Sequence, residues 1–202
     1  MNKVLTKASR IIQSIKYRHF DRFVFIHINK TGGSSIEKAL NIPHEHKTAL
    51  EKISEIGHIS WTMKHSFTVI RNPWDKVVSH YFYRLQNNTT GLRENSIEFH
   101  DWVKLTYRDQ DPLFFNKPKM FMPQINWITD TSNNILVNEI IHFENLENEF
   151  FCMLKKLGIS NVVLPHAKKS NRGDYRNYYN EETIAIVYNW FERDIKRFGY
   201  TF

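Results

Sequence analysis

The stretch "FVFIHINKTGGSSIEKAL", residues 23–40, contains the features that decide the fold. It begins with a short apolar run rich in β-forming residues, which is typical of a buried strand. It ends with "SSIEKAL", which favours the start of a helix. A loop with Lys30 and Thr31 ahead of two glycines and two serines joins them. A Walker-type phosphate loop has its lysine after the glycines, so the order here is reversed.

This loop has the chemistry of an anion site. Gly32 and Gly33 allow the backbone to turn tightly. The first amides of a helix have no partners within it, so they point toward an anion placed there. Ser34 and Ser35 add hydroxyl donors, and Lys30 adds a charge. The alternative is an ordinary strand-to-helix turn with an exposed lysine.

A second strand-to-helix stretch, "VIRNPWDKVVSHYFYRL", has a similar arrangement. Arg71 directly follows a predicted strand at 66–70, and ligands of open α/β sheets bind outside the carboxyl ends of strands. Arg71 can hold a phosphate with two parallel hydrogen bonds, and Ser79 can add a hydroxyl. In the alternative interpretation Arg71 pairs with Asp75, and Ser79 is only a small packing residue.

The rest of the chain continues the alternation of strands and helices. We predict a helix over 96–107, a strand over 138–143, a helix closed by Gly158 and a single last helix from Glu181. This pattern favours an α/β fold with a mostly parallel sheet. With no repeat or linker, residues 1–202 are predicted to form one domain. Residues 1–21 are a basic helix or arm, expected to pack on that domain.

Composition favours an anionic partner. The net charge is +7 and the pI is near 9.4, which suits nucleotides, sulfated glycans, nucleic acid or anionic lipid. The one cysteine, Cys152, lies in a predicted helix and is expected to be buried. No apolar run approaches the roughly 20 residues of a membrane span, so we expect no stable membrane insertion and a cytoplasmic location.

The two motifs together, "KTGGSS" and "RNPWDKVVSHY", resemble those of the sulfotransferases. The resemblance is strongest to the carbohydrate group, which includes the heparan and chondroitin enzymes and small bacterial members. The segments "QINWITD" (124–130), "IIHFENLENEF" (140–150) and the ending at 175–202 extend it from about residue 22 to the end of the chain.

This resemblance implies a donor, 3′-phosphoadenosine 5′-phosphosulfate, and a P-loop-NTPase-like three-layer fold with a central sheet flanked by helices. It implies sulfuryl transfer to a hydroxyl or amine, with a glycan or glycoside as the acceptor. The reversed loop would hold the 5′-phosphosulfate, and Arg71 with Ser79 would hold the 3′-phosphate. The implied donor-binding residues are Lys30, Thr31, Gly32, Gly33, Ser34, Ser35, Arg71, Ser79 and Arg172.

Catalysis would need stabilisation of the leaving oxygen and a base. Lys30 suits the first role. A sulfuryl group carries less charge than a terminal phosphoryl group, so we expect no metal, and "HEH" (44–46) shows no matching ligand pair. Carbohydrate members carry a histidine-containing segment between the two motifs. His46 is therefore the first choice for the base, which predicts activity rising through about pH 6 to 7. His44 is second, and Glu45 and Glu51 remain alternatives.

Several other residues have expected structural or binding roles. His27 is expected in the core, and His65 is expected to be structural. The basic loop at 168–175 is a candidate lid over the donor. Its candidate donor contacts are Lys169, Asn171, Arg172 and Gly173. The residues suggested for an acceptor groove are Gln124, Asn126 and Trp127.

Three other classes of protein are alternatives to this interpretation. A nucleoside-phosphate kinase would carry its lysine after the glycines. A nucleic-acid-binding module would place basic residues among exposed aromatics, whereas here they sit at strand ends. A chain that binds the donor without turnover would not need Lys30 and His46. The sequence thus favours a nucleotide donor and no nucleic-acid partner.

Overall fold

The computed structural model describes the backbone of residues 2–165 and 172–202, and side chains from residue 11 onward within those ranges. The chain divides into two compact units, each with its own core. The sheet unit comprises Met1–Ile70 and Asn126–Ala167, and the helical unit comprises Arg71–Ile125 and Lys168–Phe202.

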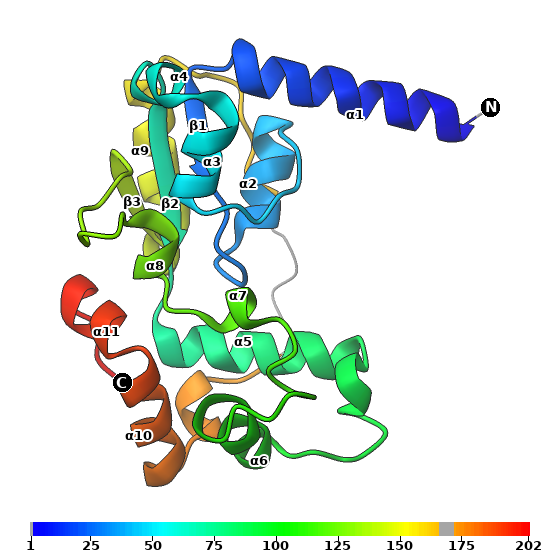
Figure 1. Cartoon of the computed structure of the whole chain (residues 1–202), viewed down its shortest axis with the longest axis vertical. Helices are drawn as coiled ribbons and strands as arrows, with labels where there is room; N and C mark the ends of the chain where they lie inside the picture. Colours follow the sequence, from blue (N-terminus) through cyan, green and yellow to red (C-terminus); the bar gives the residue numbers. More distant parts are fainter. Residues whose placement is uncertain (1, 166–171) are drawn as a thin grey trace. The chain divides into compact units, whose positions relative to one another are not determined.

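The sheet unit is built on three parallel strands in the order β1-β2-β3 (Figure 1). They are β1 Phe23–Ile26, β2 His65–Ile70 and β3 Glu139–His142. Phe25 lies opposite Phe67, and Thr68 lies opposite Ile140. All three strands were predicted, so the α/β class with a parallel sheet is confirmed. The P-loop-NTPase-like classification stays a prediction.

One face of this sheet carries the core of the unit. Side chains alternate between the two faces of a strand, so Phe23 and Phe25 share a face. Phe25 stacks on Phe67 with ring centroids 4.9 Å apart. Two predicted helices, α2 Gly33–Leu40 and α9 Leu146–Lys156, pack on this face. Their buried apolar residues in the core are Ile36, Leu40, Phe150, Met153 and Leu154.

The prediction that Cys152 is buried was wrong, because its side chain is exposed. Helix α9 turns Phe150, Met153 and Leu154 toward the core, so the two residues between Phe150 and Met153, Phe151 and Cys152, lie on the outer face. The unit also contains α3 Ala49–Ile56 and α4 His58–Thr62. Helix α8, Ile125–Ile128, begins at the boundary residue.

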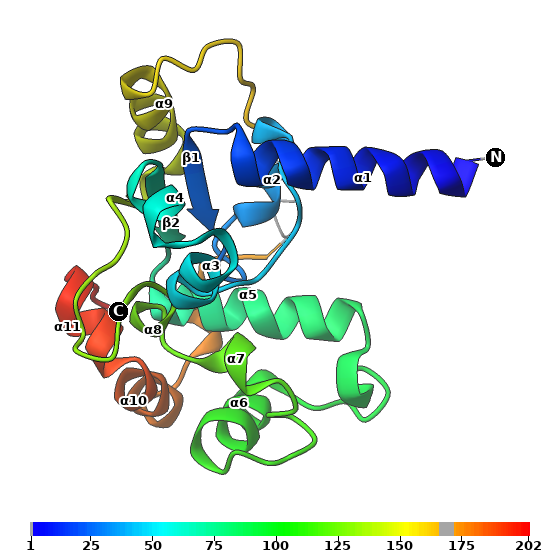
Figure 2. The same ribbon diagram turned by 45° about the horizontal axis from the view of Figure 1, so that its top comes forward.

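Helix α1, Asn2–His19, forms as expected and runs out from the sheet (Figure 2). Its last turn is anchored, because the hydroxyl of Tyr17 accepts from the Phe25 amide at 2.8 Å. Ile11, Ile12 and Ile15 are 52%, 67% and 50% exposed, so the expectation of a packed helix was wrong for these residues. Within residues 2–165 and 172–202, no helix is both long and apolar enough to cross a bilayer.

The helical unit packs around α5, Pro73–Gln86. The side chain of Asn72 accepts from the Trp74 amide at 3.0 Å, and Pro73 occupies the first turn. The other helices are α6 Phe99–Val103, which continues as a π-helical turn over Lys104–Arg108, α7 Pro118–Phe121, α10 Glu181–Trp190 and α11 Glu192–Phe198.

The predicted single helix after Glu181 is two helices. The backbone leaves helical geometry at Phe191, with φ −107° and ψ 19°. The break turns Asp194 and Ile195 inward together with Phe191. Asp194 then accepts from the amides of Gln124 at 2.7 Å and Ile125 at 2.8 Å. These backbone bonds, which the apolar pattern did not reveal, account for a buried carboxylate at this point.

Candidate active site

The loop after β1 has the backbone of an anion-binding turn. Gly32 caps α2 with φ 84° and has no side chain with which to bond the first helical amides. Its carbonyl accepts from the Ser35 amide at 3.0 Å, but it supplies no side-chain cap to the amides of Gly33 and Ser34, which suits an anion. Ser34 is exposed at the start of the helix, whereas Ser35 is buried.

Lys30 also has a left-handed backbone, with φ 68°. This region is uncommon for residues other than glycine, asparagine and aspartate, and such strain is concentrated at functional sites. The Thr31 side chain is fully buried, and its hydroxyl donates to the Ile28 carbonyl at 2.8 Å. That hydroxyl thus holds the loop in shape, which differs from the donor-binding role implied for it.

Gly33 allows the start of α2 to approach His27 closely. A Cβ atom on Gly33 would lie 2.0 Å from Cδ2 of His27, a distance at which one of them must move. The close approach, rather than an unusual φ angle, therefore requires glycine at this position.

We expect Gly33→Ala to lower the melting temperature by several degrees, because the added methyl must displace a buried ring. Differential scanning calorimetry measures the shift. Gly173→Ala is the control, because a Cβ there meets no atom within 4 Å. Equal melting temperatures for the two variants would contradict the close contact at Gly33.

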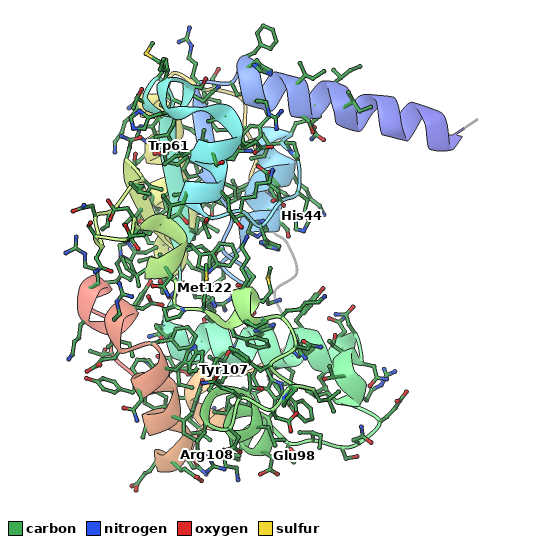
Figure 3. All side chains as sticks on the ribbon, viewed as in Figure 1. His44, Trp61, Glu98, Tyr107, Arg108 and Met122 are labelled. Carbon is green, nitrogen blue, oxygen red and sulfur yellow. The ribbon has the colours of Figure 1, made fainter. Side chains whose placement is uncertain are left out.

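Behind the loop, three imidazoles gather around one carboxylate in the sheet unit. Glu37 Oε1 lies 2.6 Å from His27 Nδ1, and Glu37 Oε2 lies 2.7 Å from His44 Nδ1 (Figure 3 labels His44 near α2). The His46 ring lies 4.2 Å from that of His27 and 5.0 Å from that of His44, centroid to centroid. The structure thus brings together both candidate bases, His44 and His46, beside the loop that contains Gly33.

Glu37 was missed by the sequence analysis. The available signal was an acid on α2 next to an apolar residue of the buried face, Ile36. Its partners lie 10 residues before it and 7 after it, a spacing that no helical or strand period predicts.

The electrostatics of the cluster keep the carboxylate charged and His46 neutral. Burial alone would raise the pKa of Glu37, but hydrogen bonds from His27 and His44 outweigh it and lower that pKa. Burial and the neighbouring His27 ring lower the pKa of His46 to about 4. The His46 Nδ1–H donates to the His27 carbonyl at 2.9 Å, because a carbonyl only accepts. The lone pair of neutral His46 therefore lies on Nε2, the arrangement that a base needs.

The same cluster contains a set of atoms close enough to hold a divalent ion. Ligand atoms of His27, Glu37 and His44 all lie within 4.8 Å of one another. The sequence did not reveal these partners of His44, because His27 directly follows β1 and Glu37 lies on α2. The short bonds to Glu37 already satisfy both Nδ1 atoms as proton donors.

The two carboxylates considered as alternative bases have other partners. Glu45 pairs with Lys47 at 3.0 Å and with Lys52. Glu51 accepts from the Thr48 amide at 2.7 Å and forms a capping box at the start of α3. These contacts favour an imidazole as the base.

In the helical unit, Arg71 and Arg172 meet at one carboxylate. Arg71 is buried, and its guanidinium pairs with Asp75 Oδ2 at 2.7 Å. Arg172 pairs with the other oxygen of Asp75. The structure therefore contains the Arg71–Asp75 pair of the alternative interpretation. It also places a second candidate donor-binding residue, Arg172, at the same carboxylate. Ser79 follows Asp75 by one helical turn. Lys169 and Asn171 lie outside the described residues.

The acceptor-groove assignments were wrong for two of three residues. Gln124 is fully buried, where it accepts from the Arg71 amide at 2.9 Å and donates to the Arg71 carbonyl at 2.8 Å. It thus holds the backbone of Arg71. Trp127 is 0% exposed and cannot present a ring to a sugar. Asn126 is exposed. His65 has the structural role expected of it, because Nε2 lies 3.0 Å from Glu139.

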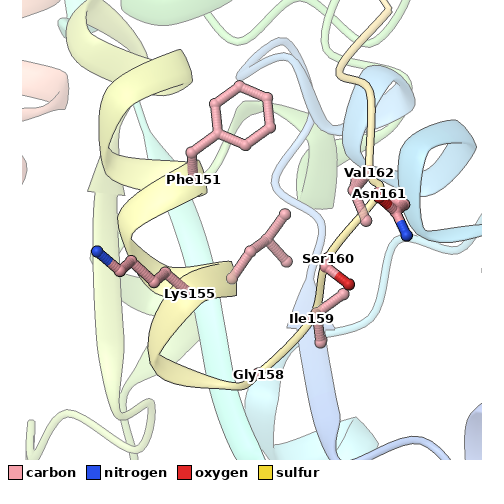
Figure 4. Close-up of a pocket in the computed structure, with 8 residues that line it drawn as sticks. Phe151, Lys155, Gly158, Ile159, Ser160, Asn161 and Val162 are labelled. Carbon is pink, nitrogen blue, oxygen red and sulfur yellow. The ribbon is translucent and has the colours of Figure 1, made fainter.

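A hollow of about 370 Å³ lies between α9 and the segment that follows it (Figure 4). Its lining includes Phe151, Leu154, Lys155 and Ile159, and it contains none of the candidate site residues named above. A donor that carries both a 3′-phosphate and a 5′-phosphosulfate needs more than the one cationic side chain found there, so this hollow does not suit it.

A model of the sulfotransferase family matches residues 13–201, and the chain belongs to that family. The chain is 25% identical to carbohydrate sulfotransferase 10 of Xenopus laevis over 215 residues. That match covers 88% of this chain, and the chain spans 60% of the length of this relative. No solved structure matches the chain significantly.

Proposed function

We propose that the protein transfers a sulfuryl group from 3′-phosphoadenosine 5′-phosphosulfate to a hydroxyl or amine of a carbohydrate. The observation that carries this proposal is the glycine turn before α2, with the neutral His46 beside it. The name of the relative, a carbohydrate sulfotransferase, supports the acceptor class. Family membership supports the donor.

Both anionic groups of the donor have proposed partners. The turn from Lys30 to Ser35 binds the 5′-phosphosulfate through the backbone amides of α2, the Ser34 hydroxyl and the Lys30 ammonium. Arg71, Ser79 and Arg172 bind the 3′-phosphate. Arg71 and Arg172 both pair with Asp75, which brings two guanidinium groups together at one place, and guanidinium groups bind phosphate through parallel hydrogen bonds.

The reaction is an in-line displacement at sulfur. His46 Nε2 takes the proton of the acceptor hydroxyl, and the acceptor oxygen forms a bond to sulfur. The bond from sulfur to the 5′-phosphate oxygen breaks, and its electron pair stays on that oxygen. Lys30 stabilises the charge that develops there. The products are the sulfated acceptor and 3′-phosphoadenosine 5′-phosphate.

Incubation with ³⁵S-labelled donor and a panel of glycans, glycosides and small alcohols tests this function. The expected result is a labelled carbohydrate product, identified by mass spectrometry. A parallel arm with ATP and Mg²⁺ tests for kinase activity. Label transfer to no acceptor, together with phosphoryl transfer in the second arm, would contradict the proposal.

Arg71→Ala should weaken binding of 3′-phosphoadenosine 5′-phosphate by about 2 kcal/mol, or about 30-fold, because a charge-assisted contact is lost. Binding of adenosine 5′-phosphate, which has no 3′-phosphate, should not change. Isothermal titration calorimetry measures both. Arg93→Ala is the matched control, since Arg93 is exposed in the same unit. Equal affinity of the unmodified protein for the two nucleotides would remove the 3′-phosphate assignment.

A further inference from the structure

We infer that Glu37 is a positioning residue of the transfer site, because its carboxylate fixes the tautomers of His27 and His44. This inference rests on the proposed function. Glu37 is 6% exposed and lies between the two imidazoles, one buried and one with 64% of its side chain exposed. A third donor, the Glu45 amide, lies 3.3 Å from Oε1.

The chemistry of an ionised carboxylate dictates the protonation of both rings. A carboxylate only accepts hydrogen bonds, so the Nδ1 atoms at 2.6 Å and 2.7 Å must both carry protons. In a neutral ring the lone pair then lies on Nε2. His46 reaches the same state by donating from Nδ1 to the His27 carbonyl. Three neighbouring imidazoles are thereby held with Nε2 as the accepting atom.

The position of Glu37 links the histidines to the donor loop. It lies one turn into α2, and Gly32 and Gly33 at the start of that helix form the turn. The His27 ring that bonds to Glu37 also lies against Gly33. One rigid helix therefore places both the phosphate-binding amides and the acceptor for the two Nδ1–H groups, which suits a site that must hold base and donor in register.

The negative charge has a second effect. Proton transfer to His46 creates an imidazolium in a partly buried place, beside two other rings. Glu37 is the buried carboxylate of this cluster, and its attraction favours that cation. Lys47, Lys52 and Glu55 form a separate ionic group with Glu45 and add no further carboxylate bond to the three rings.

Glu37→Gln is the variant that tests this inference most directly. The amide has nearly the same size, but it offers one accepting oxygen and one donating NH₂ group. One of the two histidines must then give up its Nδ1 proton and carry it on Nε2. In serine protease triads, replacing the orienting carboxylate by its amide lowers turnover by about 10⁴-fold for this reason. Here the carboxylate acts on His46 through its charge and through the neighbouring His27 ring, not by a direct bond, and we expect a loss of about 100-fold or more in turnover number, with donor affinity within about 3-fold of the original.

Three further variants test whether the loss comes from the carboxylate of Glu37 and acts through the histidines. Glu37→Asp keeps the carboxylate and should restore part of the turnover. Glu139→Gln is the matched control, because it removes a carboxylate from His65, another histidine of the sheet unit, and should leave turnover unchanged. His44→Ala combined with Glu37→Gln should be no slower than Glu37→Gln alone, since residues that act through one another are not additive.

The histidine tautomers can also be measured directly, without an activity assay. Long-range ¹H–¹⁵N spectra report which nitrogen of each histidine carries the proton, and His44→Ala assigns the His44 signals. The Nδ1–H form is expected for His27 and His44 in the unmodified protein. One of them should change to the Nε2–H form in Glu37→Gln. Calorimetry confirms that the variant is folded.

Several outcomes would overturn the inference. They are unchanged tautomers in Glu37→Gln, near-normal turnover in that variant, or additive losses in the double variant. Stoichiometric metal in the purified protein that disappears in Glu37→Gln would also overturn it, because a metal-bound Nδ1 carries no proton. Absence of transfer by the unmodified protein would instead contradict the proposed function, and the spectra would still test the tautomers.

Discussion

Replacement of His46 by alanine is expected to lower the turnover number about 10³-fold, with binding of 3′-phosphoadenosine 5′-phosphate unchanged. The imidazole takes a proton from the acceptor and makes no contact that the desulfated nucleotide needs. His46 is partly buried, with its Nδ1 bonded to the His27 carbonyl, so Nε2 is its only accepting atom. Initial-rate kinetics and calorimetry on the same preparation measure the two quantities.

His46→Asn refines this result. An asparagine amide can keep the hydrogen bond to the His27 carbonyl, but it cannot take up a proton at useful pH. It should therefore be nearly as inactive as alanine, while His44→Ala should be milder. His58→Ala, at an exposed histidine of α4, is the control. Near-normal turnover of His46→Ala, together with inactivity of Glu45→Gln or Glu51→Gln, would move the base to a carboxylate.

The pH dependence should differ from the expectation drawn from the sequence. An unperturbed histidine predicts a rise through about pH 6 to 7. Burial and the His27 ring lower the pKa of His46 to about 4. Because only the neutral ring can accept a proton, kcat/KM should be level over roughly pH 6 to 8 and fall only on approach to that lower value. A rise of kcat/KM through pH 6 to 7 would contradict a base with the lowered pKa of His46.

Lys30→Ala is expected to lower the turnover number by about 10² to 10³-fold and to change donor affinity far less. Charge on the leaving oxygen develops only in the transition state, so a residue that stabilises it acts mainly on turnover. Single-turnover kinetics and nucleotide titration separate the two quantities.

The left-handed backbone of Lys30, with φ 68°, requires a second variant. Alanine removes the charge but remains strained there, whereas glycine removes the charge and relieves the strain. If the charge matters, Lys30→Gly should be as slow as Lys30→Ala. Lys38→Ala, at an exposed lysine of α2, should be unchanged. A turnover number retained in Lys30→Gly, with only donor affinity reduced, would make Lys30 a binding residue.

The elements that position the site could be predicted because their signals are local. A short apolar run, a pair of glycines and a helix-forming segment lie next to one another in residues 23–40, and the structure has β1, the turn and α2 there. Pro73 is a similar local signal, because proline favours the first turn of a helix and α5 begins at that residue.

Other features depend on contacts between distant segments and could not be predicted. The break at Phe191 accompanies the burial of Asp194 against amides near residue 124, which no helical periodicity reveals. Trp127 is a residue type on which sugars often stack, yet packing buries its ring completely. Cys152 lies outside only because of the side on which α9 meets the sheet.

The sequence by itself determined the α/β class, the glycine turn before α2 and the family, because backbone freedom, helix starts and motif order are properties of short contiguous segments. Only the tertiary structure decided that Glu37 joins His27 and His44, and that Arg71 shares Asp75 with Arg172. Hydrogen bonds and ion pairs act over a few ångströms, and which side chains come that close depends on how strands and helices pack. The protonation state of His46 follows the same rule, since burial and neighbouring rings set it.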